Sequence, residues 1–518
     1  MRYTNPILPG FHPDPSICRL GGDFFLVTSS FEFFPGVPLF HSRDLVDWRQ
    51  VGHCLTRESQ LPLGRGHWNC STGIFAPTIR CHDGRFYMIT TNIGNGGNFF
   101  VWTDDPFGEW SEPVWIPKAP HSGSSDFEND PSLLFDDDGT VYLTTHRNEQ
   151  CVIDIESGKR GSDVRTVWEG AGGGNLEAPH LYHIGDYYYL MAAEGGTERR
   201  HRVTIARSRS PWGPFESCPH NPILSNWHRR DTILQATGHG DLVDDAAGNW
   251  WMVFLAIRDM PTGSPRTHHL GRETCLAPVA WVDGWPVVNG NGTADLRMEG
   301  PLPRPAQPRG SDGSGDPAPC GDRPGPANDP AWTFLRNPHR EHYSWTERPG
   351  WLALRPSAVT LDDVGSPTWI GKRLQHPACE ASTLMDFAPG PGEEAGLTIF
   401  MNHRHHCEIA LRAESGQARL VVRRRIGSLL AETWSQPFSG GRIRLGVVAT
   451  PNEFVLFFED PKGGARIEAD RQETRYLSTE VASGFTGVFL ALYATARTRG
   501  TPVGTAYFDG LTITPARA

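Results

Sequence analysis

The sequence predicts an all-β protein, in which a five-bladed β-propeller is followed by a C-terminal β-sandwich. Three observations support this fold class. Glycine (57 residues) and proline (43) accompany many aromatic residues, including 26 Phe and 17 Trp, a mixture typical of short strands joined by tight turns. One pattern recurs through the first half of the chain. The last third lacks that pattern and instead alternates apolar and polar residues, as strands with one buried face do.

The recurring pattern has a small or acidic residue before a proline-like position, then an apolar run, a polar turn containing glycine, and an aromatic strand. Each copy is typical of a β-hairpin, and the copies begin roughly 50–60 residues apart, near the period of propeller blades. An open sandwich would not require a repeat at this period, so we favour the propeller. The copies are DPSICRLGGDFFLVTSS from Asp14, APTIRCHDGRFYMITTN from Ala76, DPSLLFDDDGTVYLTTH from Asp130, APHLYHIGDYYYLMAAE from Ala178 and the more divergent GDLVDDAAGNWWMVFLA from Gly240.

The segments between the copies can supply the outer strands of the blades. Examples are GVPLFHSRDLVDWRQVG and GNFFVWTDD, which are apolar runs next to turn residues. Four-stranded units of this kind, packed face to face, close into a ring with few exposed strand edges.

The composition changes after GRETCLAPVAWVDGWPVV, where the repeat fades. Residues 301–330 are rich in Pro, Gly and Asp, as linkers are. Beyond them, segments such as EAGLTIFMN, EFVLFFED and VFLALYATA alternate with the period of strands. We therefore expect a propeller domain at residues 1–300, a linker at 301–330 and a β-sandwich at 331–518.

The net charge of −11 argues against a nucleic-acid backbone or an anionic membrane as a partner and suits a neutral substrate. No apolar run is long enough to span a bilayer, and the first residues lack the pattern of a secretory signal. The ten Cys show no CxxC pair or metal-ligand spacing, so we expect reduced thiols. These features predict a cytoplasmic protein, and they leave a homo-oligomer open.

Equivalent positions on the innermost strands of a propeller converge on its axis, so residues at the repeat starts should face one another. Asp14 and Asp130 stand at repeat starts, and Glu177 and His239 stand directly before the starts at Ala178 and Gly240. The offset of Glu177 is consistent with a role that differs from that of the two aspartates. Taken singly, the Asp of an Asp-Pro pair is more often a turn residue that bonds its own backbone. Clustered carboxylates are costly without a purpose, and their matched repeat positions favour a functional site.

A cluster of this kind can hydrolyse a glycosidic bond. One carboxylic acid donates a proton to the leaving oxygen, while a carboxylate activates a water or attacks the anomeric carbon. A third carboxylate nearby keeps the pKa of the acid high through like-charge repulsion. The repeat starts supply this number of acidic side chains.

Several motifs occur in one order along the chain: NPILPGFHPDPSI, SSFEFFPGVPLFHSRDLVDW, GIFAPTIR, NDPSLLFDDDG, LEAPHLY, AEGGT, QATGHGDLV and HLGRETCLAPVAW. By these motifs the chain resembles glycoside hydrolase family 43, specifically its two-domain β-xylosidase and α-L-arabinofuranosidase branch. The resemblance makes the propeller the catalytic domain and implies Asp14 as general base, Glu177 as general acid and Asp130 as the residue that tunes and orients the acid. It also implies inversion, with the carboxyl groups of Asp14 and Glu177 roughly 6.5–9.5 Å apart.

The same resemblance suggests residues that bind the substrate. Arg272 corresponds to an arginine that contacts the terminal sugar, and a surface ion pair with Glu273 is the alternative interpretation. Phe31 corresponds to a hydrophobic wall, since sugar C–H faces pack on aromatic rings. The alternative is a core role, which fits Phe33 and Phe34 about as well. Phe75 stands where many relatives have Trp or Tyr, which bears on the choice of sugar. Thr197 is a further candidate for lining the site.

His239 is also a candidate for substrate binding, and the resemblance suggests that it holds a water or a cation on the axis. We expect no required cofactor and no catalytic metal, with calcium near His239 as the one cation to consider. The resemblance also suggests that the sandwich packs on the propeller and contributes a loop that walls the pocket, for which Phe485 is a candidate. A carbohydrate-binding role is the other interpretation of this domain. The basic run Arg423–Arg425 is interpreted as a solvated strand edge.

We therefore expect an exo-acting inverting glycoside hydrolase that releases xylose from the non-reducing end of short β-1,4-xylo-oligosaccharides. The nearest alternative is an α-L-arabinofuranosidase, or an enzyme with both activities, because the two sugars present similar hydroxyl groups. A sugar-binding propeller without turnover is the remote alternative, since binding alone does not need an acid with a raised pKa. The expected partner is a small oligosaccharide.

Overall fold

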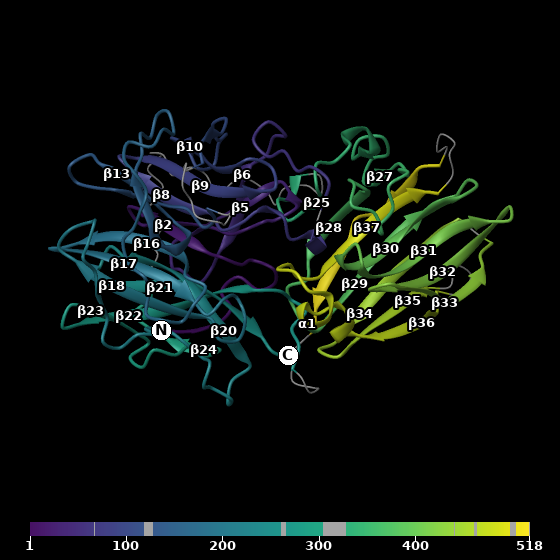
Figure 1. Cartoon of the computed structure of the whole chain (residues 1–518). Helices are drawn as coiled ribbons and strands as arrows, with labels where there is room; N and C mark the ends of the chain where they lie inside the picture. Colours follow the sequence, from purple (N-terminus) through teal and green to yellow (C-terminus); the bar gives the residue numbers. More distant parts are fainter. Residues whose placement is uncertain are drawn as a thin grey trace, which may run out of the picture.

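The computed structural model is nearly all β (Figure 1). Within the described part of the chain, the α-helical segment is a single turn, α1 (Thr479–Ala482), and no helix there is long or apolar enough to cross a membrane. Most of the expected linker lies outside the described residues. The structure describes residues 1–66, 68–118, 128–260, 266–303, 328–439, 441–459, 464–497 and 504–516.

Five sheets form the blades of a propeller, which confirms the predicted fold class. Each repeat hairpin supplies the two inner strands of a blade, and the intervening segments supply the outer ones. From the axis outward, the first blade has β2 (Ser16–Leu20), β3 (Asp23–Val27), β5 (Gly36–Ser42) and β6 (Arg49–Leu55), and the second has β8 (Thr78–His82), β9 (Arg85–Ile93), β10 (Gly97–Thr103) and β11 (Val114–Trp115), with β7 (Gly73–Ile74) also on β9. The third blade has β12 (Ser132–Phe135), β13 (Val141–Thr145), β14 (Glu149–Val152) and β15 (Arg165–Thr166), and the fourth has β16 (Glu177–Ile184), β17 (Tyr187–Glu194), β18 (Arg202–Ser208) and β19 (Glu216–Ser217). The fifth blade has β20 (Leu234–Asp244), β21 (Trp250–Arg258), β22 (Glu273–Val282) and β23 (Trp285–Val288).

The blades close into a ring through their innermost strands. β2 contacts β8 and β20, and β12 contacts both β8 and β16. β16 in turn contacts β20 and so completes the circle. Before the first blade, β1 (Arg2–Thr4) pairs with β24 (Arg297–Glu299) after the last one. This pairing joins the two ends of the propeller chain.

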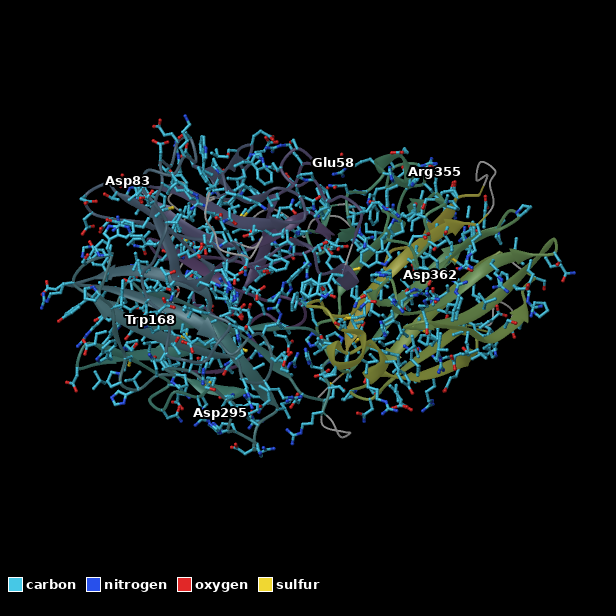
Figure 2. The ribbon with its side chains drawn as sticks, in the orientation of Figure 1. Glu58, Asp83, Trp168, Asp295, Arg355 and Asp362 are labelled. Atoms are coloured by element: carbon cyan, nitrogen blue, oxygen red, sulfur yellow. The ribbon has the colours of Figure 1, made fainter. Side chains whose placement is uncertain are left out.

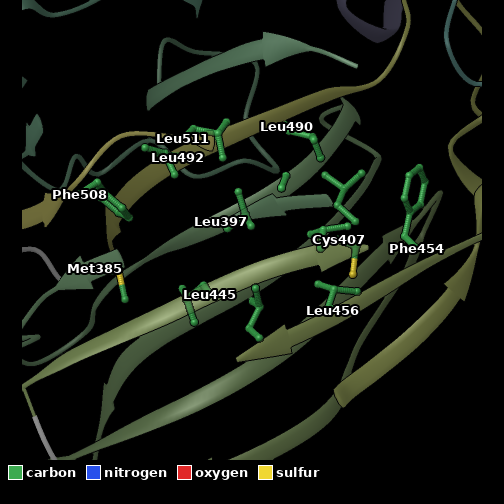
Figure 3. Close-up of a cluster of buried hydrophobic side chains, with 14 of the residues drawn as sticks. Met385, Leu397, Cys407, Leu445, Phe454, Leu456, Leu490, Leu492, Phe508 and Leu511 are labelled. Carbon is green, nitrogen blue, oxygen red and sulfur yellow. The ribbon is translucent and has the colours of Figure 1, made fainter. Parts of the chain in front are cut away.

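The C-terminal part forms a sandwich of two sheets, drawn in green and yellow in Figure 1. Alternate residues of facing strands, including Leu397, Cys407, Leu445 and Leu490, point toward one another to form its core (Figure 3). One sheet has the order β33 (Leu429–Pro437), β32 (Gln417–Ile426), β31 (His405–Glu414), β30 (Glu393–Asn402), β37 (Phe489–Ala496), β28 (Thr368–Arg373), β25 (Thr333–Leu335) and β4 (Phe33–Phe34). The other has the order β26 (Tyr343–Ser344), β27 (Leu352–Leu354), β38 (Ala506–Phe508), β29 (Cys379–Asp386), β34 (Arg442–Ala449), β35 (Glu453–Glu459) and β36 (Arg466–Glu473), with β39 (Thr512–Pro515) also on β29.

One strand of the sandwich comes from the propeller sequence. β4 pairs with β25, so that Phe34 lies opposite Phe334 at the end of the sandwich sheet that runs from β33 to β4. Beside this pairing, the buried guanidinium of Arg336 contacts the carboxylate of Glu32 at 2.7 Å. The hydroxyl of Thr72 donates to the same carboxylate at 2.6 Å. The two domains therefore share both a sheet and a buried ion pair.

The interpretation of Arg423–Arg425 as a solvated edge is wrong for Arg423. β32 lies between β31 and β33, and the Arg423 side chain is buried. Its guanidinium donates to Glu394 at 2.6 and 2.9 Å and to Glu408 at 3.2 Å. Asp362, labelled in Figure 2, lies 3.5 Å from Arg425. The run is basic because it neutralises carboxylates on neighbouring segments.

Candidate active site

A pocket forms where the repeat starts meet, and one loop of the sandwich contributes to it. It contains all eight side chains predicted for the site, together with Phe485, which was predicted as a wall from the sandwich, and three residues that were not predicted to line it. The lining residues are Asp14, Phe31, Phe75, Ala76, Asn129, Asp130, Glu177, Thr197, His201, His239, Arg272 and Phe485.

Asp14 is buried two residues before β2, and its backbone has a positive φ of 54°. Arg272 donates to both of its carboxylate oxygens, at 2.6 and 3.2 Å, and the Ser29 hydroxyl donates at 2.5 Å. Burial alone would raise the pKa of Asp14. The charges of Arg272 and His239 and the Ser29 hydrogen bond outweigh burial and hold that pKa below its usual value. Asp14 is therefore an ionised carboxylate at neutral pH, as a general base must be.

Glu177 is the first residue of β16, where the strand register shifts between Glu177 and His180. Burial and the negative charges of Asp130 and Asp14 raise the pKa of Glu177 to about 8. The positive charge of Arg272 opposes this shift but does not cancel it. Glu177 therefore keeps its proton at neutral pH, as a general acid must.

Asp130 contacts the backbone directly beside Glu177. Its carboxylate accepts a hydrogen bond of 3.2 Å from the backbone N–H of Ala178, the residue directly after the acid. Asp130 has a positive φ of 53°, close to that of Asp14, as expected of matched repeat positions. The side chain is thus fixed to the backbone that carries Glu177, and its negative charge contributes to the raised pKa of that residue.

Arg272 bonds to the base and not to its sequence neighbour. Glu273 instead accepts two hydrogen bonds from Arg258, at 2.6 and 2.7 Å, so the interpretation of an Arg272–Glu273 ion pair is wrong. Arg272 also donates to the Thr197 hydroxyl at 3.0 Å. Within one pocket Arg272 therefore contacts both Asp14 and Thr197.

Three phenylalanine rings wall the pocket. Phe31 lies 5.2 Å from Phe75 and 5.9 Å from Phe485 between ring centroids, and Phe75 lies 6.1 Å from Phe485. The alternative of a core role applies to Phe33, whose ring stacks on Phe489 at 4.2 Å within a hydrophobic cluster. Phe31 thus shares a segment with core residues, but it faces the pocket.

The sandwich holds Phe485 in place through contacts with the segment 69–71 of the propeller. The backbone N–H of Phe485 donates to the Ser71 hydroxyl at 2.8 Å, and the Asn69 amide donates to the carbonyl of Ala482 at 3.1 Å. The exposed ring of Trp68 packs edge-on against Phe485 at 4.7 Å. The C-terminal domain therefore supplies one wall of the pocket.

His239 and His201 lie beside the base. The Nδ1 atom of His239 is 3.6 Å from an Asp14 oxygen. Burial and the nearby His239 and Arg272 lower the pKa of His201 to about 3, so this imidazole is neutral. A Cβ atom at position 238 would lie 1.8 Å from Cδ2 of His201, so glycine at 238 makes room for the ring. His201 and Asn129 were missed because neither stands at a repeat start.

Calcium prefers six to eight oxygen ligands. The carboxylate nearest His239 is that of Asp14, which already binds Arg272 and Ser29, so the surrounding side chains do not fit a protein-built calcium site. The prediction of a calcium ion near His239 stays a prediction, and the chemistry below uses none. Among the described residues, a group of three side chains with clustered metal-ligand atoms occurs elsewhere, at Asp136, Asp137 and His183.

A buried network of polar side chains joins the innermost strands, at residues that follow the repeat starts. Asp241 of β20 accepts hydrogen bonds from Arg80 at 2.9 and 3.2 Å, from Tyr182 at 2.6 Å and from Ser16 at 2.6 Å. Arg80 also contacts His180 at 2.9 Å. Side chains of four inner strands are thereby tied together, which fixes the strand starts that carry the carboxylates.

Glu194 fixes the loop that precedes Glu177. Its buried carboxylate accepts hydrogen bonds from the backbone N–H groups of Ala171 and Gly173, each at 2.5 Å, and from Thr204 at 3.0 Å. These contacts shape the glycine-rich loop that leads into Glu177 at the start of β16.

A glycoside hydrolase needs a protonated carboxylic acid and an ionised carboxylate in one pocket, and this pocket with its aromatic walls contains both. The chain belongs to glycosyl hydrolase family 43. The model of "Glycosyl hydrolases family 43" matches residues 3–286, and that of "Beta xylosidase C-terminal Concanavalin A-like domain" matches residues 324–514. The predicted resemblance is confirmed.

Similar proteins include both activities of the branch. A non-reducing end alpha-L-arabinofuranosidase of Bacteroides ovatus is 40% identical over 95% of this chain and 91% of its own, and a xylosidase/arabinosidase of Butyrivibrio fibrisolvens is 37% identical over 95% and 96%. The structure of the Bacteroides ovatus "Xyloglucan PUL GH43B" protein matches with a TM-score of 0.89 and 37% identity, covering 100% of both chains. That of a xylan beta-1,4-xylosidase from Bacillus halodurans matches with a TM-score of 0.87 and 30% identity, covering 99% of both.

Proposed function

We propose that this glycoside hydrolase is an exo-acting inverting β-xylosidase that releases xylose from the non-reducing end of short β-1,4-xylo-oligosaccharides. The observation that carries the proposal is the pair of opposite protonation states in one pocket. The pKa of Glu177 is raised to about 8, while that of Asp14 is held below its usual value.

In the proposed reaction, Glu177 donates its proton to the glycosidic oxygen as the bond to the anomeric carbon breaks. Asp14 accepts a proton from the water that attacks the same carbon from the opposite face. Asp130 supports the acid because its negative charge favours the protonated form of Glu177. The product then has the inverted configuration, and Arg272 is available to donate hydrogen bonds to sugar hydroxyls.

The exo mode of action is supported by the walls of the pocket. Phe31, Phe75 and Phe485 line it, and the Phe485 loop comes from the second domain. The Asp241 network links the inner strands just beyond the repeat starts. A pocket with walls from both domains and with linked strands beyond it accepts the end of a chain more readily than its middle, so we expect release of single sugars.

α-L-Arabinofuranosidase activity, alone or alongside xylosidase activity, is the second candidate. It is favoured by one specific observation, the 40% identity to an arabinofuranosidase over 95% of this chain. Phe75 bears on this choice as well, since Phe keeps an aromatic face but offers no hydrogen bond to a sugar hydroxyl.

The test compares p-nitrophenyl β-D-xylopyranoside with the α-L-arabinofuranoside, and xylobiose with an arabinosylated xylo-oligosaccharide. Higher kcat/KM on both xylosides supports the leading proposal, whereas higher values on the arabinosides would replace it with the second candidate. The anomeric form of the first-released sugar, followed by NMR, tests inversion, and retention would contradict the roles of Asp14 and Glu177. A location in the cytoplasm and assembly into a homo-oligomer stay predictions.

A further inference from the structure

A second cavity, of about 240 Å³, lies between the propeller and the sandwich. Its lining side chains share a property that sets them apart from the active site: four are basic or imidazole groups, and none of the ten is acidic. The lining residues are His12, Gln50, Ala331, Lys372, Arg373, Gln375, His376, Leu511, Ile513 and Pro515.

Arg373 is the central group of this cavity. Its side chain is buried, with 6% of the residue exposed, and it donates to the carbonyl of Phe11 at 2.8 Å and to the Thr333 hydroxyl at 3.3 Å. Its Nη2 atom has no hydrogen-bond partner among the described residues. Burial lowers the pKa of Arg373 to about 10, and no carboxylate opposes this shift. A buried guanidinium that has no carboxylate partner in the described part of the chain is costly, so an anion would stabilise it.

The other polar groups of the cavity also favour an anion. His12 is buried, and its Nδ1 atom lacks a hydrogen-bond partner in the described chain. Lys372 lines the cavity as well, and its ammonium bonds to Asp329 at 2.6 Å. His376 faces the same space from the sandwich. Burial, together with the positive charge of the nearby Arg373, lowers the pKa of His53 to about 3.

We propose that this interdomain cavity binds a small tetrahedral oxyanion of the phosphate or sulfate class. The guanidinium of Arg373 lines the cavity and supplies a positive charge on a group that suits oxyanions, and Lys372 supplies a second positive charge nearby. Gln50 and Gln375 add neutral amides to the same space. The site is distinct from the catalytic pocket, with which it shares no lining residue.

The anion would stabilise the contact between the two domains near the catalytic base. Arg373 comes from β28 of the sandwich, whereas Phe11 and His12 precede Asp14 in the propeller. The ring of Phe11 lies 5.9 Å from that of Phe31, a wall of the active site. A ligand that binds only the folded, docked arrangement raises the stability of the whole chain.

The test uses the full-length protein and inorganic phosphate, with ionic strength held constant by sodium chloride. Calorimetric titration should give a single-site isotherm, and Tm should rise with phosphate in a saturable way. Lys372→Gln should weaken phosphate binding about tenfold or more, because a positive charge near the anion is lost. The matched control Lys159→Gln removes an exposed lysine of the propeller and should leave the affinity unchanged.

Arg373→Met should abolish phosphate binding, and Lys372→Gln keeps the test decisive if that variant does not fold. Replacing phosphate by sulfate should preserve binding, whereas acetate should bind much more weakly. No saturable effect of phosphate, or equal affinity in wild type and Lys372→Gln, would overturn the proposal. Binding of acetate without binding of phosphate would also overturn it and would point to a carboxylate ligand.

Discussion

The substitution Asp130→Asn tests how the acid keeps its proton. Asparagine has nearly the same shape, and its side-chain oxygen can still accept the hydrogen bond from the Ala178 N–H. The change therefore removes one negative charge with little change in geometry. Burial is the largest cause of the raised pKa of Glu177, and the negative charge of Asp130 is the second largest. Removing this charge should therefore lower the pKa of Glu177 below its wild-type value of about 8.

The expected fall is roughly one pH unit or more, which is typical of a charge removed from a neighbouring buried carboxyl group. One unit corresponds to about 1.4 kcal/mol less stabilisation of the protonated acid. The sign follows from the role of Glu177: the reaction needs its protonated form, so activity is lost as pH rises through that pKa. The alkaline limb of the kcat/KM profile should therefore move to lower pH in Asp130→Asn.

The assay measures kcat/KM for xylobiose against pH for the wild type, Asp130→Asn and Asp138→Asn. Asp138 is an exposed aspartate in the turn between β12 and β13 of the same blade, so its substitution should not move the limb. A limb that stays in place in Asp130→Asn, beside a wild-type limb near pH 8, would refute the electrostatic argument. It would leave burial as the cause of the raised pKa.

Three further substitutions test the site. Asp14→Ala should abolish hydrolysis even of aryl glycosides, because no leaving group replaces the missing base; substantial residual turnover would remove Asp14 from that role. Glu177→Ala should reduce kcat/KM for xylobiose far more than for substrates with acidic phenol leaving groups, which need little protonation, and equal losses would count against it as the acid. Phe485→Ala should raise KM roughly 3–10-fold by removing one aromatic wall, whereas Leu429→Ala, at an exposed position of the same domain, should not; unchanged KM in Phe485→Ala would show that the wall does not contact substrate.

The sequence predicted the acidic and imidazole side chains of the pocket that stand at a repeat start or directly before one. Asp14 and Asp130 stand at repeat starts and His239 stands directly before one, and all three have positive φ values near 50° at the axis. Their convergence follows from propeller geometry alone, so it could be predicted without coordinates. Ascribing roles to Glu177 and Arg272 needed the family resemblance, because nothing in their spacing distinguishes a proton donor from a turn residue.

The remaining features depend on contacts between distant segments. His201 enters the pocket from a segment outside the repeat starts, beside a glycine at 238 that only the folded structure relates to it. Arg423 seemed exposed because its neighbours are basic, but its carboxylate partners come from β30 and β31. The cavity around Arg373 combines side chains from two domains. Neither periodicity nor composition reports such pairings.

The strand shared by the two domains has a consequence for protein engineering. β4 begins two residues after Phe31, so the end strand of one sandwich sheet is continuous with a wall of the pocket. A propeller expressed alone would expose the backbone of β4, lose the partner of Glu32 and lack Phe485. Chimeras that exchange the C-terminal module between relatives must therefore transplant β4 with its β25 partner, since a boundary drawn between residues 301 and 330 would separate two paired strands.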